Sequence, residues 1–234
     1  MRVHRVLVPE LEAGRRPLRG AEAHHLRDVL RVREGARVEA FDGGGRVAWT
    51  RVVSVDPHEV VLAIEEPHEG AEEAGVELTL AVALLKGDKL AEVVRRGTEL
   101  GATRFRLFAC RRADAGPPSA AKIRRFRRVA EEAAKQSRRA RVPEVLAPVA
   151  LEALELGPRT VVAVPGAPPL RAVLERPQPA SLTCVTGPEG GLEPAEVDAL
   201  AARGARPVGL GPRVLRAETA PAALAAAILL PDAL

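Results

Sequence analysis

The chain has 234 residues, of which 47% are hydrophobic and 28% charged, and its formal net charge is +4. This length allows one large or two small domains, and the hydrophobic content is ample for a real core. No run of about 18 apolar residues occurs and the first residues form no signal-peptide core. We therefore expect a soluble, cytoplasmic protein with no membrane partner.

Cysteine and histidine, which often carry chemistry, are scarce. Cys110 and Cys184 lie far apart, each in an apolar, strand-like run, which favours buried free thiols over a disulfide or a metal site. The five histidines show no metal-ligand spacing. We therefore expect no metal.

The modest net charge conceals a strongly basic segment. Between Arg95 and Arg141 there are 15 lysine and arginine residues against 4 acidic ones, while the rest of the chain is acidic overall. This density of positive charge is typical of a face that binds a polyanion and favours nucleic acid as the partner. The alternative is an arginine-rich, solvated helix surface, which thermophilic proteins also display.

The first part of the chain is predicted to be a small, mostly β module. Alternating polar and apolar residues predict four strands, at residues 3–8, 37–41, 47–55 and 60–64. Residues 25–30 recur at helical spacing and predict one short helix. We expect a compact barrel with a helical plug, which acts as a binding module. Residues 65–75 are acidic with Pro and Gly and are predicted to be a linker, so the domains are placed at residues 1–68 and 74–234.

After the linker, strands alternate with helices. Strands are predicted at residues 76–85, 105–110, 160–165, 182–185 and 207–210, and helices at residues 88–101, 119–139, 194–204 and 221–230. This alternation predicts an α/β domain with a parallel sheet. The last helix is rich in Ala, Leu and Ile, which suits burial or an oligomer interface.

The helix after Ser119 carries most of the basic residues. Ser119 can cap it, and apolar residues at steps of three and four predict one packed face with basic side chains around the rest. Such a helix can contact phosphates but reads few bases. The residues predicted to contact nucleic acid are Arg124, Arg125, Arg128, Arg138 and Arg139.

A glycine loop follows the strand at residues 182–185. Its sequence is Thr186-Gly187-Pro188-Glu189-Gly190-Gly191, which lets backbone groups approach a ligand closely. Neither a P-loop nor a dinucleotide fingerprint is present, and Glu189 would repel a polyphosphate. A neutral or cationic ligand fits better, although a tight turn with nothing bound would share this composition.

Further motifs accompany the glycine loop along nearly the whole chain. They are Leu210-Gly-Pro-Arg-Val-Leu-Arg-Ala-Glu-Thr-Ala220, Lys86-Gly-Asp-Lys89 with Thr98-Glu-Leu-Gly101, Glu132-Ala-Ala-Lys-Gln-Ser-Arg-Arg139, and His24-His-Leu-Arg-Asp-Val-Leu-Arg31. Together with the glycine loop, these motifs resemble the bacterial 16S ribosomal RNA uridine-N3 methyltransferase family of the SPOUT superfamily.

The resemblance implies a fold and partners beyond what the residues alone predict. It implies a PUA-like barrel for RNA, a C-terminal α/β domain with a deep trefoil knot, S-adenosylmethionine bound at the knot, a homodimer, and 16S rRNA of the 30S subunit as substrate. The implied cofactor pocket is lined by Val164, Pro165, Gly166, Thr186, Gly187, Pro188, Glu189, Gly190, Gly191, Val208, Gly209, Leu210, Gly211, Val214 and Leu215.

Three residues are candidates for catalysis. Methylation of uracil N3 requires removal of an imide proton, so Arg216 is expected to bind an oxygen of the anion, and Glu189 or Glu218 to orient the base or accept the proton. Structural roles compete with these: Glu218 could cap the last helix, Arg216 could pair with a carboxylate, and Glu189 could brace the loop.

Three other functions stay open at this point. A relative could methylate a ribose 2′-hydroxyl or another base, or the chain could be a non-catalytic RNA-binding assembly factor. A generic nucleotide-binding enzyme is disfavoured because the phosphate motif is missing.

Overall fold

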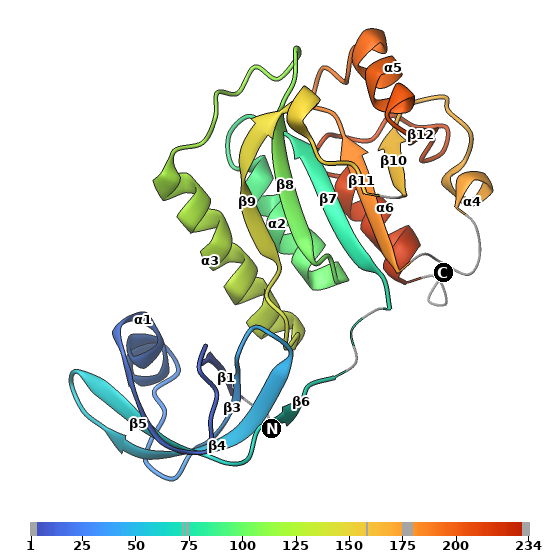
Figure 1. Cartoon of the computed structure of the whole chain (residues 1–234). Helices are drawn as coiled ribbons and strands as arrows, with labels where there is room; N and C mark the ends of the chain where they lie inside the picture. Colours follow the sequence, from blue (N-terminus) through green and yellow to red (C-terminus); the bar gives the residue numbers. More distant parts are fainter. Residues whose placement is uncertain (1–3, 72, 74, 158, 175–179, 231–234) are drawn as a thin grey trace. The chain divides into compact units, whose positions relative to one another are not determined.

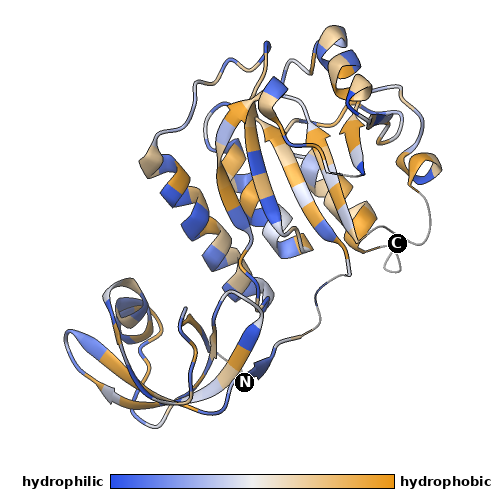
Figure 2. Cartoon of the chain, viewed as in Figure 1, coloured by the Kyte–Doolittle hydropathy of each residue, from blue (hydrophilic) through white to orange (hydrophobic). Residues whose placement is uncertain are grey.

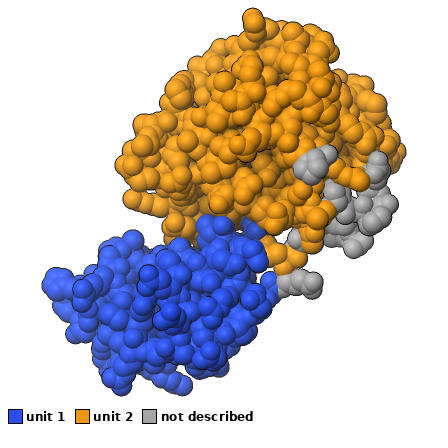
Figure 3. Space-filling view, viewed as in Figure 1, with its two compact units in different colours: residues 1–72, 134–142 blue, residues 73–133, 143–234 orange. Residues whose placement is uncertain are grey.

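The computed structural model describes residues 4–71, 73, 75–157, 159–174 and 180–230. The chain divides into two compact units, coloured separately in Figure 3. Unit 1 comprises Met1–Glu72 and Ala134–Val142, and unit 2 comprises Glu73–Ala133 and Pro143–Leu234. The first unit therefore includes a second, later segment that the boundaries expected from the sequence do not contain.

Unit 1 is a curved, mainly antiparallel sheet in the strand order β1-β3-β4-β5-β2, with β6 paired to β4 (Figure 1). The strands are β1 (His4–Leu7), β2 (Gly14–Arg19), β3 (Arg37–Phe41), β4 (Arg46–Val55), β5 (Glu59–Ile64) and β6 (His68–Glu69). The predicted hairpin is confirmed, because β3 and β4 pair antiparallel across the glycine turn. One carboxylate oxygen of Asp42 accepts hydrogen bonds from the next amides of that turn, at Gly44, Gly45 and Arg46.

Strand β2 was not expected from the sequence. Its residues, Gly14–Arg19, carry three arginines and Pro17, and only Leu18 is buried. β2 pairs with β5 alone at one end of the sheet order, where a proline without an N–H group is tolerated. The strand is therefore fixed by its partner and not by its own apolar pattern.

The predicted short helix is present in altered form. An α-turn, α1 (Gly20–His24), continues into a π-turn, η1 (His25–Val29). The wider π-turn shifts the side chains around the axis, so Leu26 is buried while Val29 is 60% exposed. The apolar spacing at residues 25–30 therefore predicts a helix here but not which of its apolar residues are buried.

Residues 134–142 complete unit 1. The Arg5 guanidinium donates to the carbonyl of Arg139 at 2.9 Å and pairs with Glu39 at 2.6 Å. Phe41 and Val47 pack in a cluster with Ala134 and Ala140. This outer cluster is separate from the main core of the unit, which lies between the strands and α1.

Unit 2 contains a six-stranded, all-parallel sheet in the order β12-β10-β11-β7-β8-β9. The predicted α/β class with a parallel sheet is therefore confirmed. The strands are β7 (Glu77–Ala83), β8 (Arg104–Ala109), β9 (Glu144–Ala150), β10 (Thr160–Ala163), β11 (Ser181–Thr186) and β12 (Ala205–Val208). Strand β9 was not predicted. It lies at the end of the sheet order, contains Pro148 and shows no alternation of polar and apolar residues. Its register with β8 is also irregular.

Four helices of unit 2 begin and end close to their predicted limits, and one short helix, at Leu170–Val173, was not predicted. The helices are α2 (Lys89–Leu100), α3 (Ala120–Ser137), α4 (Leu170–Val173), α5 (Pro194–Ala202) and α6 (Ala220–Leu229), with a 3₁₀ turn η2 (Leu151–Ala153). Helix α2 ends at Gly101, whose φ of 107° closes the helix in the left-handed region. The Ser119 hydroxyl accepts the amide of Lys122 at 3.3 Å, as expected of a cap.

Helices α2 and α6 pack against each other on one face of the sheet (Figure 1). Figure 2 shows the apolar colouring concentrated in the central strands and in α6, while α3 carries many hydrophilic positions. Because every strand pair is parallel, the carboxyl ends of β7, β10, β11 and β12 meet at one edge of the sheet. Loops leaving that edge can therefore form one site.

Candidate active site

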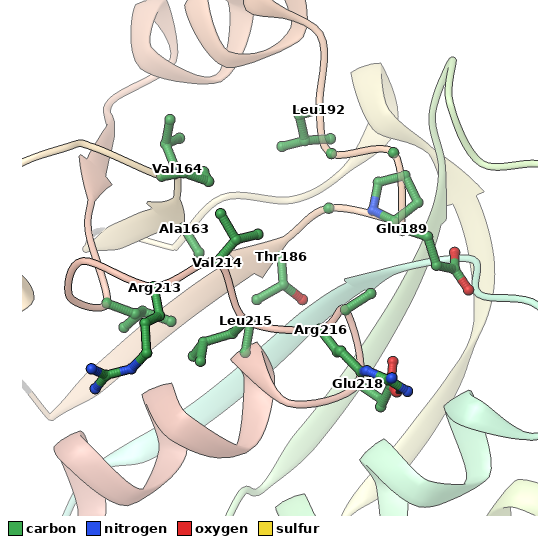
Figure 4. A pocket seen from close by; sticks show the side chains of 18 of the residues that line it. Ala163, Val164, Thr186, Glu189, Leu192, Arg213, Val214, Leu215, Arg216 and Glu218 are labelled. Carbon is green, nitrogen blue, oxygen red and sulfur yellow. Dashed lines mark ion pairs between the residues drawn. The ribbon is translucent and has the colours of Figure 1, made fainter.

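A cavity of about 650 Å³ lies at the carboxyl ends of β10, β11 and β12 in unit 2 (Figure 4). Three loops enclose it: the one after β10, the glycine loop after β11 and the loop from β12 to α6. All the predicted catalytic residues and all but two of the predicted cofactor residues line it, namely Val164, Pro165, Thr186, Gly187, Pro188, Glu189, Gly190, Gly191, Val208, Leu210, Gly211, Val214, Leu215, Arg216 and Glu218. The three loops converge as expected.

Gly166 and Gly209 do not line the cavity. A side chain at Gly209 would come within 2.3 Å of the Ala167 carbonyl oxygen, so its glycine is needed for two backbones to touch. Its amide donates to the Pro168 carbonyl at 2.8 Å. Gly166 has φ of 80° in the turn after β10. Both glycines therefore belong to the backbone turns behind the cavity lining, and the expectation that they line the cavity is wrong.

Several lining residues were not singled out from the sequence. They are Lys89, Ala163, Leu192, Val197, Ala217 and Ala220. Lys89 is the most important because it brings an ammonium from the first turn of α2. The motif that contains it, Lys86-Gly-Asp-Lys89, was visible in the sequence but suggested no role.

Glu189 is held by contacts from two elements. Its carboxylate accepts the Lys89 ammonium at 2.7 Å and the Lys86 amide at 3.2 Å. Partial burial acts to raise the pKa of Glu189, but these hydrogen bonds and the Lys89 charge outweigh it and hold the pKa below its ordinary value. Glu189 is therefore a fixed anion and a weak proton acceptor, which favours the bracing role.

Glu218 is in a different environment. It is 9% exposed, and its Oε2 atom has no hydrogen-bond partner among the described residues. The Lys89 ammonium lies 3.9 Å from Oε2 and a guanidinium nitrogen of Arg216 lies 3.9 Å from Oε1. Helix α6 starts at Ala220 and its N-cap residue is Thr219, so Glu218 does not occupy the capping position considered for it. An anion so placed has room to accept a ligand's hydrogen bond.

The Arg216 side chain is exposed to solvent. That side chain is 85% exposed, whereas the Arg216 carbonyl accepts the amides of Thr219 and Ala220 at the start of α6. The backbone is therefore fixed while the guanidinium stays accessible at the cavity (Figure 4). Its 3.9 Å approach to Glu218 exceeds a hydrogen bond, so pairing does not occupy it.

The cavity walls suit a ligand that is partly apolar and rich in hydrogen-bonding groups. The Thr186 hydroxyl is buried beside the cavity and has no partner among the residues described. Val214 also lines the cavity yet is 80% exposed, an unusual fraction for an apolar side chain. A molecule with an aromatic base and hydroxyls would cover Val214 and satisfy Thr186, and would leave Glu218 free for a second ligand.

The basic face of α3 is partly as predicted. Arg124, Arg125, Arg128 and Arg138 are exposed, although Arg125 also makes a two-pronged pair with Asp88 at 2.7 and 3.0 Å. Arg139 is 8% exposed, so its expected place on the exposed face is wrong. Arg138, whose φ of 61° lies in the left-handed region, follows the last residue of α3, so Arg139 no longer continues the exposed face of the helix.

Other reactive groups do not contribute to this site. Burial raises the pKa of Cys184 above its ordinary value and that of Cys110 to about 11, so both thiols stay protonated and unreactive at neutral pH. Within the described ranges, no group of three or more metal-ligating side chains is present, and no helix is long and apolar enough to cross a membrane.

Comparison with known proteins places the chain in a family. An RNA methyltransferase domain model matches residues 72–229, and an RNA methyltransferase PUA domain model matches residues 18–65. The ribosomal RNA small subunit methyltransferase E of a Synechocystis species is 38% identical, over 86% of this chain and 68% of its own length. The enzyme of the same name from Bacillus subtilis is 34% identical, over 86% of this chain and 84% of its own length.

Solved structures agree with this assignment. A ribosomal RNA small subunit methyltransferase E from Neisseria gonorrhoeae, bound to S-adenosylmethionine, superimposes with a TM-score of 0.91 at 26% identity over 98% of both chains. A Legionella pneumophila protein in complex with the same cofactor gives a TM-score of 0.91 at 24% identity, over 99% and 98%, and supports the fold alone. The chain therefore belongs to the RNA methyltransferase family, with a PUA domain ahead of its methyltransferase domain.

Proposed function

We propose that this protein transfers a methyl group from S-adenosylmethionine to N3 of a uridine in 16S rRNA of the small ribosomal subunit. The observation that carries the proposal is Glu218, a buried carboxylate with a free oxygen beside a cavity that suits the cofactor. The names of the curated relatives support the rRNA substrate. The N3 position rests on the chemistry of the site and on the resemblance described above.

The cofactor is proposed to lie among the three loops. Main-chain groups of the glycine loop and of residues 208–211 are near enough to the cavity to bind polar groups of a nucleoside, and Val214 offers apolar surface for its base. No phosphate needs a site in this ligand, which agrees with the carboxylate of Glu189 in the loop. When bound, the cofactor supplies a methyl group that is activated by a sulfonium charge.

The chain's own residues then have three tasks. Glu218 accepts the N3 proton, Arg216 binds an oxygen of the resulting anion, and Glu189 holds the glycine loop through Lys89 and the Lys86 amide. The N3–methyl bond forms as the methyl–sulfur bond breaks, and the proton ends on Glu218. Holding the nitrogen and the methyl carbon in line is the larger part of the rate enhancement.

RNA binding is proposed for the PUA domain and for the exposed arginines of α3. Arg124, Arg125 and Arg128 present positive charge on α3, and Arg138 follows just after its end, which suits phosphate contacts; Arg139 is excluded because it is buried. We propose domains at residues 1–68 and 74–234. Residues 134–142 lie within the second range of the sequence but belong to the first compact unit.

A knotted fold and a homodimer complete the proposal. The sheet order places β10, β11 and β12 out of sequence, which supports the trefoil knot of the SPOUT superfamily. Helix α6 leaves small apolar residues partly exposed along its length and Leu230 40% exposed just after it, which supports a dimer contact. Sedimentation equilibrium would test the dimer, which predicts twice the 24.8 kDa chain mass.

The decisive experiment uses labelled S-adenosylmethionine with 30S subunits, and separately with naked 16S RNA, from cells that lack this protein. Nucleoside mass analysis should find 3-methyluridine. A methylated ribose or another methylated base would overturn the N3 assignment, and cofactor binding with no incorporation into either RNA would favour the assembly factor.

A further inference from the structure

Lys89 lies between two carboxylates from different loops. Its ammonium is 2.7 Å from Glu189 Oε1 and 3.9 Å from Glu218 Oε2, and its side chain is 35% exposed. An ammonium has three donors, and the Glu189 bond uses one of them. The backbone position is set by the first turn of α2, a rigid element packed on α6.

Glu218 therefore lies between two hydrogen-bond donors. The order of the groups is donor (Lys89), acceptor (Glu218) and donor (Arg216). Lys89 approaches Oε2 and Arg216 approaches Oε1 of the same carboxylate, both at 3.9 Å. Neither distance is a hydrogen bond, so both cations and the free Oε2 atom retain capacity for a ligand. The three groups come from α2 and from the loop before α6, on one side of the cavity.

This order is complementary to one edge of uracil. The edge has O4 as acceptor, N3–H as donor and O2 as acceptor. Cytosine presents an amino donor and then two acceptors, so its amino group would face a cation and its N3 would face the carboxylate. Guanine places a donor where uracil has O2. Selectivity therefore comes from two sources, namely contacts that attract uracil and contacts that repel the other bases.

We propose that Lys89 is a specificity-determining residue, which donates to one uracil carbonyl oxygen while Arg216 donates to the other and Glu218 accepts N3–H. The inference rests on the proposed function and names the base at the same site. Loss of the N3 proton spreads negative charge over O2 and O4, so each oxygen meets its own cation. Glu189 is then a positioning residue that aims Lys89.

The test measures binding, so that it does not depend on methyl transfer. Uridine and cytidine 5′-monophosphate are titrated by NMR into the protein saturated with S-adenosylhomocysteine, for wild type, Lys89→Met, Lys89→Arg and Arg96→Met. Arg96 is the control, because it is a cation of the same helix whose guanidinium pairs with Glu92 at 2.5 Å and does not line the cavity.

Wild type and Arg96→Met should bind the uridine nucleotide on the order of tenfold more tightly than the cytidine nucleotide, and Lys89→Met should reduce this preference to about threefold or less. Lys89→Arg should retain most of it, which also shows that the fold survives. Equal preference in wild type and Lys89→Met would overturn the inference. If the preference behaves as expected and no 3-methyluridine forms on 30S subunits, the proposed function fails while the inference stands.

Discussion

The two loops that face each other across the cavity are built differently. In the glycine loop, Glu189 is held by Lys89 and by the Lys86 amide, and the Gly190 carbonyl accepts Arg112 at 3.1 Å. In the loop from β12 to α6, none of the backbone–backbone hydrogen bonds between described residues involves residues 210–215. Val214 and Arg216 are mostly exposed there.

The difference separates two functions. A loop with many contacts can hold a ligand in place without being reorganised, whereas a loop with few contacts can be ordered by the ligand that it covers. We infer that the glycine loop contributes to cofactor affinity alone, whereas the second loop also carries the chemistry through Arg216 and Glu218. Substitutions in the two loops should therefore change different kinetic constants.

Arg216→Ala should have the largest effect. Removal of the donor to an anionic oxygen is expected to lower kcat by about 10²–10³-fold, while cofactor affinity changes little because the guanidinium is exposed and makes no hydrogen bond. Methyl transfer to 30S subunits and calorimetric cofactor binding measure the two effects. Near-normal turnover would show that the role given to Arg216 is wrong.

Glu218→Gln should lower kcat by about 10²-fold, because an amide cannot accept the N3 proton. Stability should not fall, since the substitution removes a buried charge whose Oε2 atom has no hydrogen-bond partner. Thermal unfolding of wild type and variant checks the second point. A clear loss of stability with normal kcat would make Glu218 a structural residue.

Glu189→Gln should act mainly on binding. The amide keeps the shape but weakens the contact to the Lys89 ammonium, so we expect cofactor affinity to fall by about tenfold and kcat at saturation to fall less. A fall in kcat as large as that of Glu218→Gln, at full cofactor saturation, would contradict the division between the two loops.

The smallest effect concerns pH. The folded-state pKa of Glu189 is lower than that of the unfolded chain, so its contribution to stability is complete above the ordinary carboxyl pKa and is lost as the pH falls through the lowered value. Because its side chain is 33% exposed, the contribution should be below about 1 kcal/mol. Urea unfolding of wild type and Glu189→Gln should differ at pH 7 and converge in acid; a difference that grows in acid would reverse the sign.

Much of unit 2 follows from local sequence. The end of α2 depends on Gly101, and the start of α5 on Pro194 and on a capping box between Glu193 and Glu196, all of which are local signals. Strands β2 and β9 were missed because each contains a proline and lies at the end of a sheet order, where pairing decides and apolar alternation is weak.

The site was predicted in outline and not in detail. Glycine and proline in the loops marked the cavity walls, because such residues permit close backbone approach. Lys89 was missed because its importance comes from lying within reach of Glu189 and Glu218, which are about a hundred and more residues away in the chain. Arg139 was misplaced because the left-handed Arg138 follows the last residue of α3, so Arg139 does not continue the exposed face of the helix.

The inclusion of residues 134–142 in unit 1 has a consequence for the order of synthesis. When residue 72 leaves the ribosome, Arg5 has no carbonyl acceptor at Arg139, and Phe41 and Val47 lack the alanines that cover them. The N-terminal module can finish folding only after about seventy further residues have been made. A fragment that ends at residue 72 should therefore bind hydrophobic dyes and aggregate, whereas the full chain should not.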